Sequence, residues 1–260
     1  MRRGRVMPAR RLLPVASVAL LAVTLAAPAP PAPRPDSVDE IVARHIAVRG
    51  GLERIRSIKT LREKGRIIAG TNRVALVTRQ LKRPSRTRLE FTLQGVTSVY
   101  VSDGGHGWKM SPFDGDTGPN PLPEQAVAEA AEQADIEGPL VDWKAKGHQL
   151  ELVGRAAVGG RETYKLKLTL KSGAVRHEYL DVESMHRVRT DSTRLVRGRP
   201  VQLETTFGEF KMAGGVHFPH AIEVMSPGRP QRLRIVVETI EVNPSLDDAL
   251  FEMKDSTGSM

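Results

Sequence analysis

The sequence contains no cysteine. This absence excludes disulfide bonds, thiolate metal sites and a cysteine nucleophile. It also excludes the lipid anchor that exported bacterial lipoproteins carry on an N-terminal cysteine. Aromatic residues are scarce as well: two Trp, three Tyr and six Phe occur among 260 residues. Few rings are therefore available for stacking on nucleic-acid bases.

Acidic residues are missing from the start of the chain, where the first eleven residues hold five arginines. Without these five, 34 basic residues stand against 30 acidic ones, a net charge of +4 that is spread along the chain. Nucleic-acid-binding proteins concentrate positive charge in patches, so nucleic acid is not an expected partner. We interpret Lys82, Arg83, Arg86 and Arg88 as a solvated strand face; contact with anionic headgroups or an acidic partner is the alternative.

Only one long hydrophobic run is present, at residues 12–27, after the arginines and before the proline-rich residues 28–35. Sixteen apolar residues are fewer than the roughly 20 that span a bilayer, and the pattern is typical of a cleaved secretory signal peptide. We expect a signal peptide over residues 1–26, a linker over 27–36 and a soluble mature protein in the periplasm. Arg10 and Arg11 match a twin-arginine signal in part, so the export route stays open.

The remaining sequence has no internal repeat and no linker, which predicts one domain over residues 37–254 and a short tail at 255–260. A helix is predicted over Ser37–Val48, because Ser37 and Glu40 fit a capping box and apolar residues recur at helical spacing. Gly50 and Gly51 end it. His45 lies on the apolar face and is interpreted as a buried histidine rather than a ligand.

Alternation of polar and apolar residues dominates from about Ile58 to Val242 and predicts ten or eleven strands. Short turns such as those at 103–105, 171–173 and 213–215 make the sheet antiparallel. A sheet this large is expected to curl. The predicted fold class is therefore α+β, mainly β, with an unclosed antiparallel barrel.

One segment interrupts the strands. Residues 111–123 are rich in proline and glycine, whereas Glu124–Asp135 consists of strong helix formers whose apolar side is mostly alanine. Val127 and Ile136 are the only larger apolar groups there. Such a shallow helix is weakly held and serves either as a movable lid or as a fixed cap over the barrel mouth.

Several segments, in their order along the chain, resemble the outer-membrane lipoprotein-sorting family, which is similar to the LolA-like periplasmic lipoprotein carrier. They are residues 50–59, 82–91, 100–108, 179–181, 207–210, 216–220 and 243–251. The resemblance extends over almost all of residues 37–254. It implies an unclosed barrel whose concave face is covered by the N-terminal helix and the inserted helix. Between them it implies a hydrophobic cavity for acyl chains.

The resemblance further implies a monomeric carrier that binds the acyl chains of lipoproteins or another lipid. Its partners would be membrane-associated donor and receptor proteins. Strand parity predicts the apolar residues of the cavity, and ordinary core packing is the alternative role for each. They are Leu89, Phe91, Leu93, Val99, Val101, Trp108, Met110, Trp143 and Phe207.

No catalytic or metal-binding pattern emerges, so we predict no enzyme activity, no cofactor and no metal. Residues 114–125 lack two ligands that a calcium loop needs, at Gly118 and Gln125. His217 and His220 point to opposite faces of a predicted strand. Asp103, His106 and Ser111 lack a nucleophile elbow. A lipid-responsive periplasmic regulator or scaffold for an envelope protein stays the alternative function.

Overall fold

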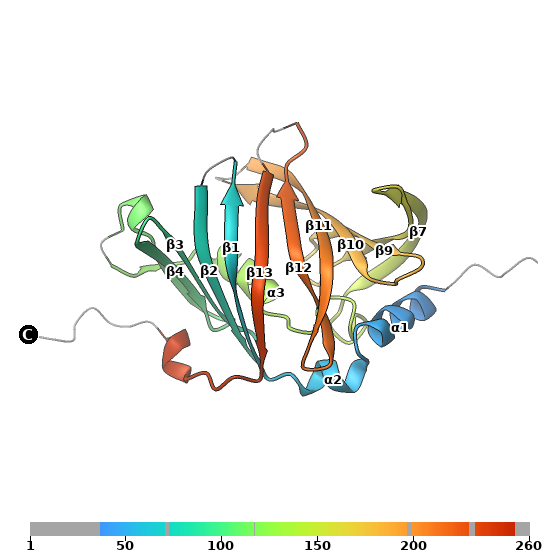
Figure 1. The fold of residues 1–260 in the computed structure, drawn as a ribbon, viewed down its shortest axis with the longest axis horizontal. Coiled ribbons are helices and arrows are strands. Elements are labelled where there is room, and N and C mark those ends of the chain that lie inside the picture. Colours follow the sequence, from blue (N-terminus) through green and yellow to red (C-terminus); the bar gives the residue numbers. More distant parts are fainter. Residues whose placement is uncertain (1–36, 71–72, 117, 197–198, 229–231, 253–260) are drawn as a thin grey trace, which may run out of the picture. The chain divides into compact units, whose positions relative to one another are not determined.

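The computed structural model describes residues 37–70, 73–116, 118–196, 199–228 and 232–252 (Figure 1). The predicted signal peptide, the proline-rich linker and the tail lie outside the described residues. Within the described part, no helix is long and apolar enough to cross a bilayer.

Thirteen strands form one antiparallel sheet. The sequence predicts ten or eleven strands, so the structure has at least two more. The strands are β1 (Thr60–Ala69), β2 (Arg73–Lys82), β3 (Arg86–Leu93), β4 (Val96–Ser102), β5 (Gly107–Met110), β6 (Asn120–Pro121), β7 (Gln149–Val158), β8 (Arg161–Thr169), β9 (Val175–Asp181), β10 (Arg187–Val196), β11 (Arg199–Ala213), β12 (Val216–Met225) and β13 (Arg232–Val242). β6 lies in the stretch of residues 111–123 that is rich in proline and glycine. Its Pro121 is tolerated because β6 is an edge strand.

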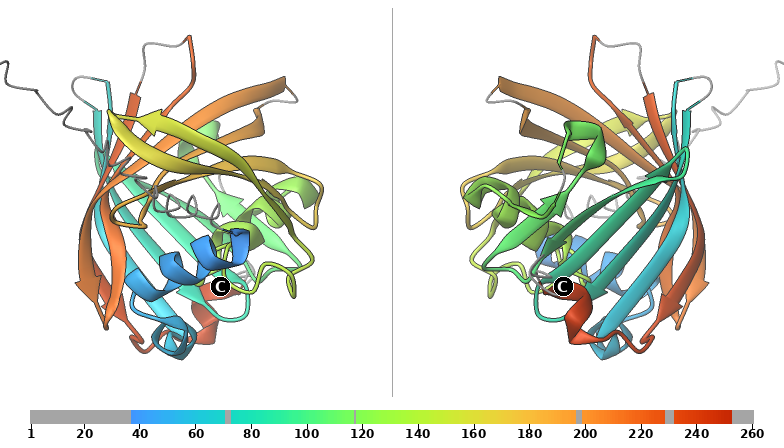
Figure 2. Two further views of the ribbon diagram at one scale, coloured as in Figure 1. Left: turned by 90° about the vertical axis from the view of Figure 1, so that its right-hand side faces the viewer. Right: turned by 90° about the vertical axis from the view of Figure 1, so that its left-hand side faces the viewer.

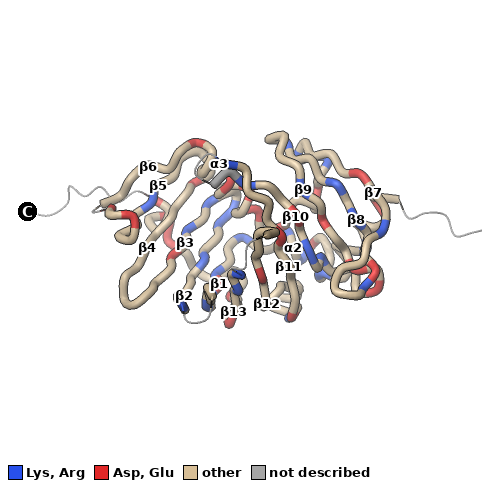
Figure 3. Tube along the Cα trace, turned by 90° about the horizontal axis from the view of Figure 1, so that it is seen from above, with Lys and Arg blue, Asp and Glu red and all other residues tan. Residues whose placement is uncertain are grey.

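The sheet consists of two meanders, β1–β6 and β7–β13, which join where β1 pairs with β13. The two edges are therefore β6 and β7, which follow each other in the chain. The connection between them contains α3 (Glu124–Gln133) and has to pass from one edge of the curved sheet to the other. Figures 2 and 3 show the strongly curved sheet with α3 across its open side. The predicted unclosed barrel is confirmed.

The other helices also lie on the concave side (Figure 2). α1 (Val38–Val48) has the predicted capping box, with the Ser37 hydroxyl accepting from the Glu40 amide. Its Ile41, Val42 and His45 are buried, and the two apolar residues pack against leucines of β7, β8 and β9. α2 (Leu52–Ser57) places Ile55 against β1, β2 and β12. A 3-10 turn, η1 (Pro112–Asp114), follows β5.

The basic residues Lys82, Arg86 and Arg88 line the convex side and hold the C-terminal segment. Lys82 and Arg86 contact Asp248 of the 3-10 turn η2 (Asp248–Phe251) at 2.6 and 2.5 Å, and Arg88 donates to the Leu250 carbonyl at 3.0 Å. Interpretation of these residues as a plain solvated face is therefore wrong. The segment they bind is too far away in sequence for local patterns to reveal it.

β1 and β13 approach each other closely at their bulge, beside Gly65, and substitution of this glycine tests that approach. A Cβ on Gly65 would lie 2.0 Å from the Val236 carbonyl oxygen, whereas one on Gly208 of β11 would meet nothing within 4 Å. We expect Gly65→Ala to lower the free energy of unfolding by about 1–3 kcal/mol, because overpacking costs that much. Gly208→Ala should change it by less than ~0.5 kcal/mol. Urea denaturation measures both, and equal stabilities would contradict the close approach.

Candidate functional site

The concave face has a filled end and an open end. At the filled end, α2 and the segment after α3 cover Leu61, Leu81, Val216 and Phe218, all of which are buried. α1 covers the leucines of β7, β8 and β9 in the same way. The hollow of the sheet is therefore filled under α1, under α2 and under the segment after α3.

At the open end, apolar side chains on the same face stay partly exposed. The pairs Ile67 with Ile235, Ile235 with Ile222, and Leu233 with Val224 place them side by side across β1, β13 and β12. On the four central strands, the apolar residues at the open end of the concave face are Ile67, Ala69, Ala75, Val77, Ile222, Val224, Leu233 and Ile235. We call this set the concave strip.

Four of the predicted cavity residues extend the concave strip. Phe91 pairs with Val77, and Leu89 and Leu93 share its face of β3. At the other side, Phe207 of β11 pairs with Ile222. Phe91 stacks on Tyr100, with ring centroids 5.9 Å apart, and the Arg187 guanidinium lies 4.3 Å from the Phe207 ring centroid. The strip then covers six neighbouring strands.

Four other predicted residues lie on the opposite, convex face: Val99, Val101, Trp108 and Met110. They pack against Leu246, Leu250 and Phe251 of the C-terminal segment. The two-residue turn Gln94–Gly95 pairs Leu93 with Val96, so Val99 faces the same side as Glu90 and not Leu89. The ninth residue, Trp143, packs in the cluster under α1. The structure thus separates the predicted set into three places.

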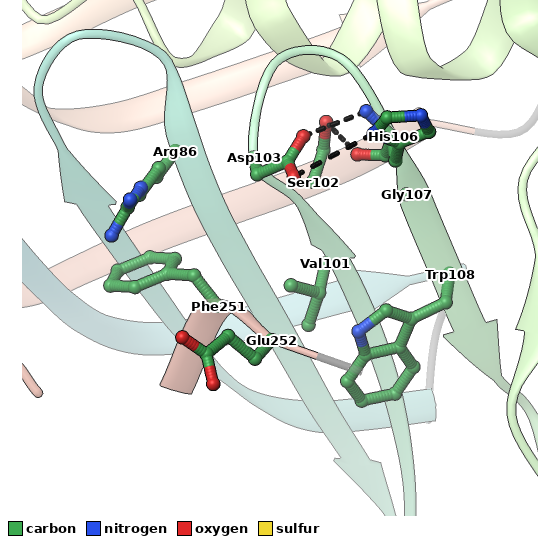
Figure 4. A pocket seen from close by; sticks show the side chains of 9 residues that line it. All are labelled: Arg86, Val101, Ser102, Asp103, His106, Gly107, Trp108, Phe251 and Glu252. Carbon is green, nitrogen blue, oxygen red and sulfur yellow. Dashed lines mark hydrogen bonds and ion pairs between the residues drawn. The ribbon is translucent and has the colours of Figure 1, made fainter. Parts of the chain in front are cut away.

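Val101 and Trp108 line a pocket of about 280 Å³ at the convex side (Figure 4). Trp108 Nε1 is buried and has no hydrogen-bond partner among the described residues. Asp103 at the rim accepts from the amides of Gly105 and His106, which lowers the pKa of its carboxyl. The Asp103 carboxylate therefore stabilises the turn between β4 and β5. A larger pocket of about 590 Å³ lies beside Phe210 and Arg189.

Cations from four places hold the end of α3 and the residues that follow it. The contacts are Lys146 with Asp135 (2.6 Å), Arg83 with Glu137 (2.9 Å), Arg49 with the Glu137 carbonyl (2.5 Å), and Arg176 with Glu132. Within α3 itself Val127 alone is buried, which agrees with the predicted shallow apolar side. Local sequence patterns carry no signal for these contacts, because most of the partners are far apart in the chain.

The candidate metal ligands are used structurally. His217 and His220 lie on opposite faces of β12, and each bonds to a backbone carbonyl, at 2.8 and 2.7 Å. Throughout the described residues, no group of three or more metal-ligating side chains gathers. The Ser111 hydroxyl accepts a hydrogen bond from Ser98, and no histidine in the described part of the chain bonds to it.

Comparison of the structure with solved structures gives matches over most of the chain. A DUF1329 family protein from Desulfovibrio piger, at 14% identity, and a LolA superfamily protein from Nitrosomonas europaea, at 12%, each match 84% of this chain and 98% of their own, with TM-scores of 0.55. The chain shares its fold with these two proteins. An outer membrane lipoprotein-sorting protein domain from Vibrio parahaemolyticus has 10% identity and the same TM-score over 83% of this chain and 97% of its own. No protein-family model and no curated protein matches the sequence.

The TM-scores and the coverage establish a shared fold, and the predicted resemblance is confirmed at that level. In this fold, the concave strip is the part of the concave face that α1, α2 and the segment after α3 do not cover. It is therefore the candidate site.

His45 makes folding sensitive to acid. Burial, with the nearby Arg49 charge, lowers its pKa to about 3, and its Nδ1 donates to the Met185 carbonyl at 2.7 Å. An unfolded histidine has a pKa of about 6.5, so below pH 6.5 the unfolded chain binds a proton that the folded one does not. Stability is then lost as the pH falls from about 6.5 towards 3.

We expect the free energy of unfolding to fall by about 2 kcal/mol from this residue between pH 7 and pH 5. His45→Gln should flatten that dependence, whereas His106→Gln, whose side chain is 95% exposed, should leave it as it is. Urea titrations at the two pH values measure the slopes. An unchanged slope in His45→Gln would show that His45 does not link folding to pH.

Proposed function

We propose that this protein is a periplasmic carrier that holds acyl chains, of a lipoprotein or another lipid, against the concave strip. The observation that carries the proposal is the continuity of the strip: partly exposed apolar side chains share one face across six strands. The similar solved structure described as a lipoprotein-sorting domain supports lipoprotein acyl chains as the cargo. The N-terminal sequence supports export. We further propose that the carrier works as a monomer, between membrane-associated donor and receptor proteins.

The energetics of such a carrier are those of exchange between two apolar environments. Removing an acyl chain from a bilayer costs about 0.8 kcal/mol per methylene, and a chain of a dozen carbons needs a comparable apolar surface in return. The uncovered side chains of the strip supply surface of that kind. The free energy gained when the acyl chain binds the protein is then similar to the free energy lost when it leaves the membrane. Both loading and release of the chain are therefore thermodynamically feasible.

Ile67 and Ile68 are neighbours on β1 that face opposite sides and are both partly buried, which makes them a matched pair. Ile67→Glu places a carboxylate in the concave strip, and we expect it to weaken binding of a fluorescent fatty acid more than tenfold, because an unpaired charge beside an acyl chain is costly. Ile68→Glu should bind nearly as the parent does. A fluorescence titration measures both. Equal affinities of the two variants, or no saturable uptake by the parent, would contradict the proposal.

We also propose that α3 moves as a lid when cargo enters. Its apolar anchoring is slight, so the ion pair between Glu132 and Arg176 contributes a substantial share of its attachment to the sheet. Glu132→Gln should raise the hydrogen-exchange rates of α3 amides about fivefold, the equivalent of ~1 kcal/mol, without changing those of β1 and β13. It should also accelerate fatty-acid uptake.

Glu129→Gln is the control for this lid test, because Glu129 lies on the same helix and accepts a hydrogen bond from Gln125 of that helix. Exchange measured by mass spectrometry at peptide level resolves the helix from the strands. If both variants exchange like the parent, the ion pair does not hold α3 closed.

A further inference from the structure

We infer that the open end of the sheet is a docking surface for an anionic phospholipid membrane. Three hairpin ends lie side by side there, where β1 meets β2, β10 meets β11, and β12 meets β13. Figure 3 looks onto this end of the sheet. The described residues at these strand ends include five arginines, all exposed: Arg73, Arg194, Arg199, Arg232 and Arg234. We call them the arginine rim.

The arginine rim lacks the compensating acids found elsewhere on the sheet. Along the strands, cations are paired, as Arg62 is with Glu241 (2.8 Å) and Arg66 with Glu238 (2.6 Å). Within the described residues, by contrast, Arg73, Arg194, Arg199 and Arg234 form no ion pair. Arg232 reaches Glu223 only at 3.9 Å, with both side chains largely exposed. The positive charge at this end is therefore available to an outside partner.

Exposed aliphatic side chains accompany the charge. Val74 and Leu76 on β2 are 45% and 61% exposed, and Val96 at the next hairpin is 39% exposed. Basic residues beside exposed apolar groups are the combination that binds the interface of an anionic bilayer, where the cations meet headgroups and the apolar groups enter the acyl boundary. The sequence between Arg73 and Leu76 shows both kinds of residue within four positions.

A membrane fits this end better than an acidic protein does. The described residues of the three hairpin ends include no aromatic side chain, and aromatic anchors dominate the energetics of protein interfaces. Protruding hairpin ends suit a flat, charged surface. Because the concave strip is uncovered at the same end, docking would bring the strip to the bilayer from which an acyl chain has to come.

Vesicle binding by the exported protein tests this inference without any cargo. We expect sedimentation with vesicles of phosphatidylglycerol and phosphatidylcholine, weaker binding as ionic strength rises, and little binding to pure phosphatidylcholine. Each basic residue at an anionic surface strengthens binding about fivefold. The triple variant Arg194→Gln, Arg199→Gln, Arg234→Gln should therefore lose about 100-fold in partition coefficient.

The matched control neutralises three exposed cations at the opposite end: Arg54→Gln, Lys59→Gln and Lys211→Gln. It should keep parental binding. Equal losses in the two triples, or equal binding to neutral vesicles, would overturn the inference. Binding of polyglutamate by the parent with no vesicle binding would overturn it too, in favour of an acidic protein partner. Ile67→Glu should still bind vesicles, which separates failure of docking from failure of the carrier proposal.

Discussion

The pairing of β1 with β13 is the constraint on which the rest of the structure depends. It joins two meanders into one sheet and leaves both free edges at strands that are consecutive in the chain. A connection between those edges has to cross the open side of the curved sheet. Cover for the concave face therefore follows from the strand order itself, and no separate domain is needed to provide it.

The unequal filling of the hollow follows from where the helices leave the strands. α1 and α2 precede β1: α2 packs at the end of the sheet where that strand begins, and α1 packs on β7, β8 and β9. At the opposite end most connections are hairpins too short to cover the face, and only Phe113 of η1, among the described residues of these connections, stacks on a ring of the strip, that of Phe91. The alternation of polar and apolar residues continues along the strands as far as the hairpins, but the helices do not extend that far. The apolar residues near the hairpins therefore remain partly exposed. This asymmetry gives the molecule a closed end and an open end.

Local signals in the sequence were sufficient for α1, α3 and the fold class. The capping box at Ser37 and Glu40 acts within one turn, and the alternation of the strands reports a half-buried sheet directly. The number of strands was underestimated because β5 and β6 are short and lie beside prolines and glycines. Strands this short contain too few residues to show an alternation of polar and apolar side chains.

The candidate site was predicted only in part, because parity within a strand does not fix register between strands. Leu89 and Phe91 lie on the concave strip, whereas Val101 and Trp108 lie on the other face. The two-residue turn at Gln94 and Gly95 could have shown this, since it pairs Leu93 with Val96. The ion pair of α3 was beyond the reach of local patterns, because Glu132 and Arg176 are 44 residues apart and meet only in the folded chain.

The central claim is that acyl chains contact the concave strip, and photo-crosslinking with a diazirine-bearing fatty acid tests it most directly. Irradiation of the loaded protein, followed by peptide mapping, should place the label on concave residues such as Ile67, Ile222 and Ile235. Label on Val101 and Trp108, or label spread equally over both faces of β1 and β13, would contradict the account.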